Sequence, residues 1–387
     1  MKVLRLISRL IVGCVFLFSG FVKAVDPWGS AYKFQDYFLA FGMEWLIPLA
    51  FLCGILLCLC EFVLGAALVF NVKMKYTAWG IMLFMSFFTL LTLYLALENP
   101  VSDCGCFGDA IIMTNWQTFY KNIVLMIFTL IIFIGRNKYP ESKSNFYDFS
   151  VTGIAALMLL GVIYYSYNHL PLIDFMPWKV GNKISELIVA KPEISEITLV
   201  YKNKETGEKI EYTTKTLPYK DTALMSKLEF VEQRKNIIKH YEEAPIKDFF
   251  ITDTLNDDYT NEIILNPNFQ FIFVTSNINK ANIKNLLSII PFYDSCYANN
   301  IDFIAVSGSA PDDVYKIVKE NNINYEFYFA DETALKSVVR SNPGMILLYN
   351  GVVVDKWHYN DFPQWKDFLK NKDKYIAISK KADKKKD

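Results

Sequence analysis

The sequence predicts two physically different parts: a membrane α-helical bundle, followed by an α/β domain outside the lipid. The first observation is the distribution of charge. The 387 residues carry 40 basic and 40 acidic side chains. Only 20 of these 80 lie in the first 170 residues, and 60 lie in the remaining 217. The other observations are apolar runs in the first part and alternating strand-like and helix-like segments in the second.

Each apolar run has about the 20 residues that a helix needs to cross a bilayer. Tyrosine and tryptophan lie near the ends of several runs, as they do at membrane interfaces. Five spans are expected, at residues 6–25, 45–72, 76–97, 117–135 and 149–167. We therefore expect membrane lipid around this part. The balanced charge argues against a nucleic-acid partner.

The sidedness of basic residues in short loops predicts the orientation. If the N-terminus is cytoplasmic, the cytoplasmic segments carry eight basic residues and the opposite short loops carry three. The eight are Lys2, Arg5, Arg9, Lys73, Lys75, Arg136, Lys138 and Lys143, and the three are Lys23, Lys33 and Lys121. This predicts a bacterial-type inner (cytoplasmic) membrane, with loop 99–116 and the C-terminal domain in the periplasm.

Cys104 and Cys106 lie in the sequence DCGCFGD, in a loop expected to face an oxidising compartment. Gly105 and Gly108 permit a tight turn. A disulfide across one intervening residue is strained, and strained exposed disulfides exchange readily. The pair is interpreted as a redox-active dithiol. A structural staple and a metal site without obvious further ligands remain as alternatives.

The other five cysteines are expected to be inert. Four lie inside spans and are interpreted as small apolar packing residues: Cys14, Cys53, Cys58 and Cys60. Cys296 is expected to be buried near the end of a helix. The three histidines, His169, His240 and His358, are scattered along the chain and indicate no metal site.

Two ionisable residues are placed within the lipid-crossing part, where an isolated charge is costly. Lys23 closes the first span, and Glu61 lies in the middle of the second. An ion pair between them would relieve both charges. The pair is interpreted either as a proton or quinone-headgroup site or as a structural clamp between helices.

The first 140 residues resemble the DoxX-like and methylamine-utilisation MauE-like membrane proteins. The resemblance is carried by Arg9, Gly13, Phe16, Ser19, Gly20, Lys23, Glu61, Gly65, the segment 103–108, Trp116, Lys121 and Asn122. It implies a four-helix membrane core, to which this chain adds a fifth span. The MauE-like branch implies disulfide formation or maturation of partner proteins outside the cytoplasm. An analogy with vitamin K epoxide reductase-like bundles implies quinone as electron acceptor, although no Cys-x-x-Cys ends a span here.

The segment after the fifth span, 170–178, is expected to be an extended exit linker with Trp178 as an anchor at the membrane surface. Residues 197–201 and 210–213 flank a polar turn and predict a β-hairpin. The predicted organisation is a membrane domain 1–140, a fifth helix and linker 141–180, a hairpin-containing region 181–242, an exported domain 243–371 and a Lys-rich tail 372–387.

The exported domain is expected to alternate strands and helices. Strands are predicted at 270–275, 301–306, 325–329, 345–349 and 352–357, and helices at 279–299, 311–321, 332–340 and 363–370. Ser309 or a neighbour is expected to cap the second helix, and Asn350-Gly351 predicts the turn of a hairpin. The tail at 380–386 is expected to be disordered.

This order resembles the thioredoxin-like fold of membrane-tethered thiol oxidoreductases. Pro343 matches the proline that is cis in that family. The redox motif of the family should follow the strand ending near Val274, where this chain has Asn279-Lys280-Ala281-Asn282 without cysteine. The resemblance therefore implies a domain that binds a partner beside Pro343 and does not exchange thiols.

The leading hypothesis is a membrane thiol–disulfide oxidoreductase or maturation factor. In it, Cys104 and Cys106 exchange electrons with an extracytoplasmic client or redox partner. One alternative is a non-enzymatic scaffold or assembly factor in which the cysteine loop is a staple. Another is a transporter-like bundle that uses Lys23 and Glu61.

Overall fold

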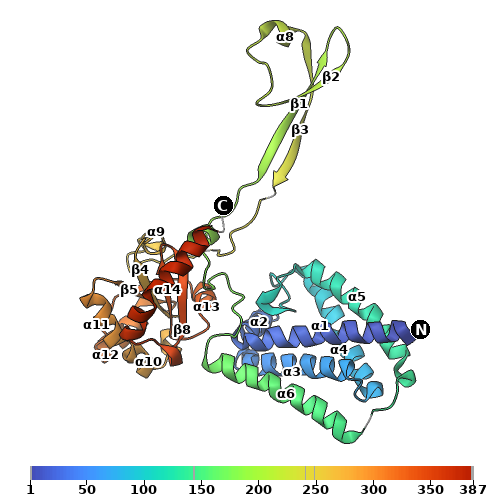
Figure 1. Ribbon diagram of the computed structural model, residues 1–387, viewed down its shortest axis with the longest axis vertical. Helices are drawn as coiled ribbons and strands as arrows, with labels where there is room; N and C mark the ends of the chain where they lie inside the picture. Colours follow the sequence, from blue (N-terminus) through green and yellow to red (C-terminus); the bar gives the residue numbers. More distant parts are fainter. Residues whose placement is uncertain (1, 143, 240, 248, 385–387) are drawn as a thin grey trace.

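The computed structural model describes residues 2–142, 144–239, 241–247 and 249–384, so Lys143, His240 and residues 385–387 of the expected tail lie outside the described residues. It contains a helical bundle, an α/β domain beside one end of that bundle, and a β-arm that projects away from both (Figure 1). The predicted order of a membrane bundle followed by an α/β domain is confirmed.

Five helical segments of the described chain are long and apolar enough to cross a membrane, as predicted. They are α1 (Lys2–Val25), the 3₁₀ turn η1 (Glu44–Leu49) with α3 (Ala50–Val69), α4 (Met74–Glu98), α5 (Asn115–Ile134) and α6 (Asn145–Asn168). Large apolar side chains such as Leu83, Leu90 and Ile134 remain exposed on these helices and offer lipid-facing surface. The chain is therefore a membrane protein.

One helix near the membrane was not expected from the sequence. Helix α2 (Pro27–Ala40) follows α1 directly, with proline in its first turn. The side chain of Asp26 caps it by accepting a hydrogen bond from the backbone N–H of Gly29 at 2.9 Å. Helix α2 packs on α3, and its residues include part of the site described below.

The α/β domain has a five-stranded sheet with the order β6-β5-β4-β7-β8. Strands β4, β5 and β6 are parallel, whereas β7 and β8 run antiparallel to their neighbours. The strands are β4 (Phe269–Thr275), β5 (Asp302–Ser307), β6 (Phe327–Phe329), β7 (Gly344–Tyr349) and β8 (Val352–His358). Each overlaps a predicted strand, and the predicted hairpin turn has positive φ at both Asn350 and Gly351.

Alternating residues of β4 enter two separate cores. Phe271 and Phe273 pack on one face, whereas Ile272 and Val274 pack on the other. The short helices around the sheet are α9 (Thr260–Ile264), η4 (Ile278–Lys280), α10 (Ile283–Ser288), α11 (Ile290–Ala298), α12 (Pro311–Asn321), α13 (Glu332–Val338) and η5 (Tyr359–Asp361). A central strand buried on both faces accounts for the continuous apolar run in the sequence.

Two expectations for this domain, a single helix at 279–299 and a disordered tail, were wrong in detail. The helix expected at 279–299 is divided into η4, α10 and α11, because Asn282 caps a new helix and Pro291 begins another. The cap position of α12 falls on Ala310, the neighbour of Ser309, as expected; Ser309 itself accepts a hydrogen bond from Ile278 N–H at 2.9 Å. The tail is helical as far as Lys384 in α14 (Trp365–Lys384).

Trp178 is not a membrane anchor. Its side chain is 0% exposed and packs against Phe249 in the core of the α/β domain, with ring centroids 4.9 Å apart. The short helix α7 (Ile184–Leu187) follows, and Ile184 N–H donates to the carbonyl of Gly351. The exit segment is therefore integrated with the sheet, because burying its large apolar side chains is more favourable than leaving them at the surface.

The arm is a three-stranded antiparallel sheet of order β2-β1-β3. Strands β1 (Ile194–Asn203) and β2 (Lys209–Thr213) confirm the predicted hairpin, while β3 (Leu228–Lys239), preceded by α8 (Thr222–Ser226), was not predicted. Only Val200 and Leu228 are buried among the described side chains of these strands. Figure 1 shows the arm extending well beyond the sheet domain.

Candidate functional site

The centre of the site is the ion pair predicted between Lys23 and Glu61. Lys23 Nζ lies 2.8 Å from Glu61 Oε2 and 3.0 Å from Oε1, and both residues are 6% exposed. Lys23 also donates to Ser19 Oγ at 2.7 Å, one turn earlier on α1. The pairing neutralises two charges that would each be costly in the bundle interior.

Glycines let α1 and α3 approach closely enough for this pair to form. A Cβ on Gly20 would meet the carbonyl oxygen of Cys58 at 2.7 Å, and one on Gly65 would meet Leu17 N at 2.7 Å. Since neither distance leaves room for a side chain, the helices contact through backbone. The glycines of the family resemblance thus determine the distance across which Lys23 meets Glu61.

The cysteine loop folds over the end of this helix pair. Asp103 Oδ1 accepts a hydrogen bond from Gly105 N–H at 2.9 Å, and Asp103 Oδ2 pairs with Lys33 Nζ of α2 at 2.7 Å. Tyr37 of α2 donates to the carbonyl of Cys104 at 2.8 Å. Gly105 has a φ of +64°, which glycine adopts without strain.

Cys106 is held directly above the ion pair. Its carbonyl oxygen accepts hydrogen bonds from Ser19 Oγ, at 2.7 Å, and from Lys23 Nζ. The thiols of Cys104 and Cys106 are free, and their Sγ atoms lie 3.1 Å apart. The structure therefore brings the predicted dithiol and the predicted ion pair together in one cluster.

The two thiols have different proton affinities. The hydrogen bond from the Cys104 thiol lowers the pKa of Cys106, and the ammonium groups of Lys121 and Lys23 lower it further, against the effect of burial. That same hydrogen bond, followed by burial, raises the pKa of Cys104. Since the thiolate is the reactive form of cysteine, these surroundings make Cys106 the more acidic thiol of the pair.

A cavity of about 250 Å³ adjoins the cluster. Its polar lining includes Lys23, Glu61 and both cysteines, while aromatic side chains dominate the rest. The aromatic lining residues are Phe16, Phe34, Tyr37, Phe38, Phe41, Phe84, Phe87, Phe88 and Phe107. Lys121 also faces it, with Nζ 4.4 Å from the centre of the Phe107 ring. An apolar cavity with few polar groups is typical of a site for a small organic molecule.

Comparison with known families gives a match for the membrane bundle. Residues 1–135 match the family model of the methylamine utilisation protein MauE. Searches of curated proteins and of solved structures return no match. The MauE match covers α1 to α5 and so includes Lys23, Glu61, Cys104 and Cys106.

The remaining cysteines differ in their surroundings. Cys58 is buried between helices, as expected of a packing residue, but Cys14 and Cys60 are exposed on the bundle surface and pack little. Cys296 is buried as predicted, and burial raises its pKa to about 12. No described side chains form a group of three histidine, cysteine or acidic residues that could hold a metal ion.

Pro343 lies beside a second cavity, between the MauE-like bundle and the α/β domain. The Asn342–Pro343 peptide bond is cis. The cavity has a volume of about 330 Å³ and is polar. Its lining includes Trp28 and Tyr32 of α2, Asn277 after β4, and Asn342. Asn277 Oδ1 and Asn342 Oδ1 are buried without a hydrogen-bond donor.

Several residues of these sites were not identified from the sequence. Lys33 and Tyr37 lie on the unexpected helix α2, so their contact with the cysteine loop had no local signal. His169 and His358, expected to be scattered, lie with ring centroids 6.5 Å apart, and His169 Nδ1 contacts Asp361 Oδ1 at 2.8 Å. Burial lowers the pKa of His358 to about 4.

Proposed function

We propose that this protein is a membrane thiol–disulfide oxidoreductase that acts on partner proteins outside the cytoplasm. The observation that carries the proposal is the pair of thiols 3.1 Å apart above the buried Lys23–Glu61 pair. A structural staple would need no asymmetry between its sulfurs. Here the surroundings favour a thiolate at Cys106 and a thiol at Cys104.

The exchange would run in two steps on the oxidised pair. A client thiolate attacks Sγ of Cys106, the Cys104–Cys106 bond breaks, and Cys104 leaves and takes up a proton. A second client thiolate then attacks the client sulfur of this mixed disulfide, and Cys106 leaves as a thiolate. The client loses two electrons and gains a disulfide, while the pair becomes a dithiol. The lowered pKa of Cys106 favours its departure in the second step.

The aromatic cavity supplies a place for the electron acceptor. Its apolar lining fits the ring of a quinone, and the ammonium of Lys121, which also lines the cavity, would donate to a carbonyl oxygen. A quinone bound there would take two electrons and two protons from the dithiol, which restores the disulfide and gives a quinol. In this arrangement the Lys23–Glu61 pair holds protons near Cys106.

The α/β domain would dock the partner without exchanging thiols. The stretch Asn279–Asn282 has no cysteine, and Cys296 is fully buried. The unpaired acceptors Asn277 Oδ1 and Asn342 Oδ1, beside Pro343, would accept N–H groups of an extended partner segment. This docking role extends the redox proposal to the exported half of the chain.

A trapping experiment tests the proposal. In Cys104→Ala, a mixed disulfide at Cys106 has no resolving thiol, so we expect a covalent partner adduct on a non-reducing gel. Cys106→Ala should give no adduct, and Cys296→Ala should behave as the native chain. Replacing Asn277 and Asn342 by alanine in the Cys104→Ala background should reduce adduct formation.

One result of the trapping experiment would contradict the redox proposal. If neither single cysteine variant captures a partner and the double variant keeps full function, the redox proposal fails in favour of a scaffold. Labelling of Cys106 by a membrane-impermeant thiol reagent in intact spheroplasts tests the orientation. Labelling only after lysis would place the loop in the cytoplasm.

A further inference from the structure

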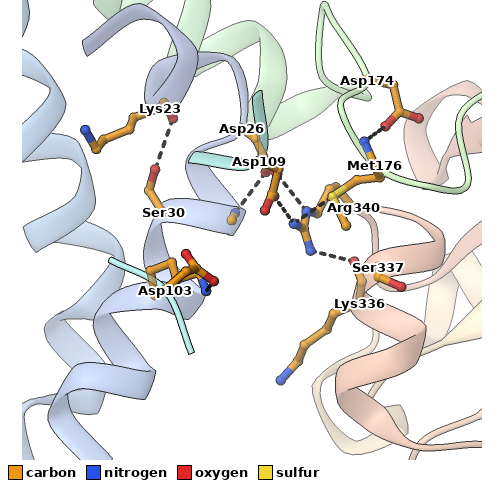
Figure 2. Close-up of polar contacts among 12 residues, drawn as sticks. Lys23, Asp26, Ser30, Asp103, Asp109, Asp174, Met176, Lys336, Ser337 and Arg340 are labelled. Carbon is orange, nitrogen blue, oxygen red and sulfur yellow. Dashed lines mark hydrogen bonds and ion pairs between the residues drawn. The ribbon is translucent and has the colours of Figure 1, made fainter. Parts of the chain in front are cut away.

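One contact between the two halves of the chain is a buried guanidinium. Arg340 follows helix α13 of the α/β domain and is 9% exposed. Its Nε donates to Asp26 Oδ2 at 2.8 Å and its Nη2 donates to Asp109 Oδ2 at 2.9 Å. Figure 2 shows both carboxylates pointing at the guanidinium from the bundle side.

Both carboxylates belong to segments that carry the redox cluster. Asp26 lies three residues after Lys23 and caps helix α2. Asp109 lies three residues after Cys106, in the 3₁₀ turn η2 (Gly108–Ala110). Arg340 therefore joins the end of the ion-pair helix to the end of the cysteine loop, although it belongs to a different domain.

The rest of the guanidinium is occupied by its own domain and by the exit segment. Nη1 donates to the carbonyl of Lys336 at 2.6 Å, and Nη2 lies 3.2 Å from Met176 Sδ. The planar fork of arginine suits such a two-carboxylate contact, which a lysine ammonium cannot reproduce. With its partners fixed on three sides, the side chain has little freedom to move.

Space around the contact is also limited. A Cβ on Gly29 would meet Asp26 Oδ2 at 2.5 Å and Arg340 Nη2 at 3.2 Å. Asp26 and Asp109 line the redox cavity, while Arg340 lines the polar cavity beside Pro343. The three side chains thus separate the cavity that holds the thiols from the cavity that faces the exported domain.

We propose that Arg340 is a positioning residue for the redox reaction. By holding Asp26 and Asp109 together, it keeps the cysteine loop against α1, and this maintains the hydrogen bond between the two thiols and the approach of Lys23 to Cys106. This inference rests on the proposed function, because it assigns the exported domain a part in activating Cys106. It makes the bundle dependent on its own C-terminal domain.

The experiment measures the reactivity of Cys106 in the full-length protein in detergent. Alkylation by iodoacetamide is followed against pH, with the modified cysteine located by fragment mass spectrometry. We expect Arg340→Gln to move the midpoint of the profile upward by about one pH unit, which slows alkylation below the native midpoint about tenfold. Asp109→Ala should also move the midpoint upward. The midpoint of Arg340→Lys should lie between those of the native protein and Arg340→Gln.

Arg234→Gln is the matched control, because Arg234 also pairs with two carboxylates but lies on the arm. The pH profile of Cys106 alkylation in this variant should match that of the native protein. An unchanged midpoint in Asp109→Ala and in a monodisperse Arg340→Gln overturns the proposal, even if both lower the melting temperature. If Arg340→Gln does not fold, the result for Asp109→Ala decides. The profile needs no client, so a failed trapping experiment with a shifted profile would reject the proposed function alone.

Discussion

At the residue scale, the side chain of Cys106 is surrounded by more polar and charged groups than its position in an apolar bundle would suggest. Its sulfur shares a hydrogen bond with the Cys104 thiol, and two ammonium groups, from Lys23 and Lys121, favour its negative charge. Opposite charge and hydrogen bonding to the charged form are two of the three causes that shift a pKa, and both act here against desolvation. Reactivity is therefore determined by residues on three separate segments of the chain.

The contribution of Lys121 can be measured directly. Because the pKa of Cys106 is lowered, its thiolate persists as the pH falls toward that pKa and is lost below it. Removing a cation raises the pKa, so Lys121→Met should move the midpoint of Cys106 alkylation upward by about half a unit to one unit. Lys75→Met, at an exposed site by the opposite end of the bundle, should leave the midpoint unchanged. A midpoint that moves downward or stays fixed in Lys121→Met contradicts this electrostatic account.

At the residue scale, sequence reasoning identified the local features and missed the distant ones. Lys23, Glu61 and the two cysteines could be predicted, because charges within apolar runs and closely spaced cysteines are visible in a short window. Arg340 could not be predicted, because its partner Asp26 is 314 residues away and nothing local distinguishes either residue. The difference between the two cysteines likewise required knowledge of the hydrogen bond between them and of the charges around Cys106.

Among the elements, the contact between α1 and α3 determines the geometry of the ion pair. The contact is made through Gly13, Gly20 and Gly65, each of which has backbone or side-chain atoms closer than 3.0 Å to the position of a Cβ. Close packing leaves no space that a methyl group could fill without displacing a helix. The separation between Lys23 and Glu61 thus depends on residues that bear no functional group.

A single methyl group tests this dependence. Gly20→Ala should force α1 away from α3 and destabilise the bundle by about 1–3 kcal/mol, a typical cost of overpacking. The measurement is the thermal unfolding midpoint in detergent, which should fall. Gly161→Ala on α6 is the control, because a Cβ there would meet nothing within 4 Å. Equal midpoints for the two variants would show that the helices can separate without cost.

Helix α14 and Trp178 show why some elements were mispredicted. The lysine content of the C-terminal segment suggested a disordered tail, but Phe368, Tyr375 and Ser379 are buried along one face of α14. Their spacing of seven and four residues is that of a helix, and the lysines occupy its other faces. Trp178 had the same ambiguity, because an exposed anchor and a core residue have the same sequence signature after a membrane span.

The whole molecule combines a junction of buried charges with a projecting arm. The bundle and the sheet domain share the two ion pairs that Arg340 makes with Asp26 and Asp109, whereas the arm buries few side chains. Strand β3 has 12 residues, which gives it a length of roughly 40 Å at about 3.3 Å per residue. At its base, Lys191 and Glu242 exchange backbone hydrogen bonds of 2.9 and 3.1 Å.

Removing the arm should therefore leave the rest of the fold intact. Replacing residues 192–241 by an Asn-Gly turn joins Lys191 to Glu242 in the geometry of a two-residue hairpin. We expect the thermal midpoint of the α/β domain to change by less than about 4 °C, the shift that about 1 kcal/mol produces in a domain of this size. A larger fall would mean that the arm stabilises the domain. Deletion of α14 from Trp365 onward is the contrasting variant and should prevent folding, because Phe368 belongs to the main core.

The contact between residues 26 and 340 also has a consequence for the order of synthesis. A chain emerging from the ribosome completes all five spans and the cysteine loop long before Arg340 is made. During that interval, Asp26 and Asp109 have no guanidinium between them, although Ser19 and Lys23 of α1 can already donate to the Cys106 carbonyl. If Arg340 positions the loop as proposed, a truncated or stalled product would react more slowly at Cys106 than the complete chain.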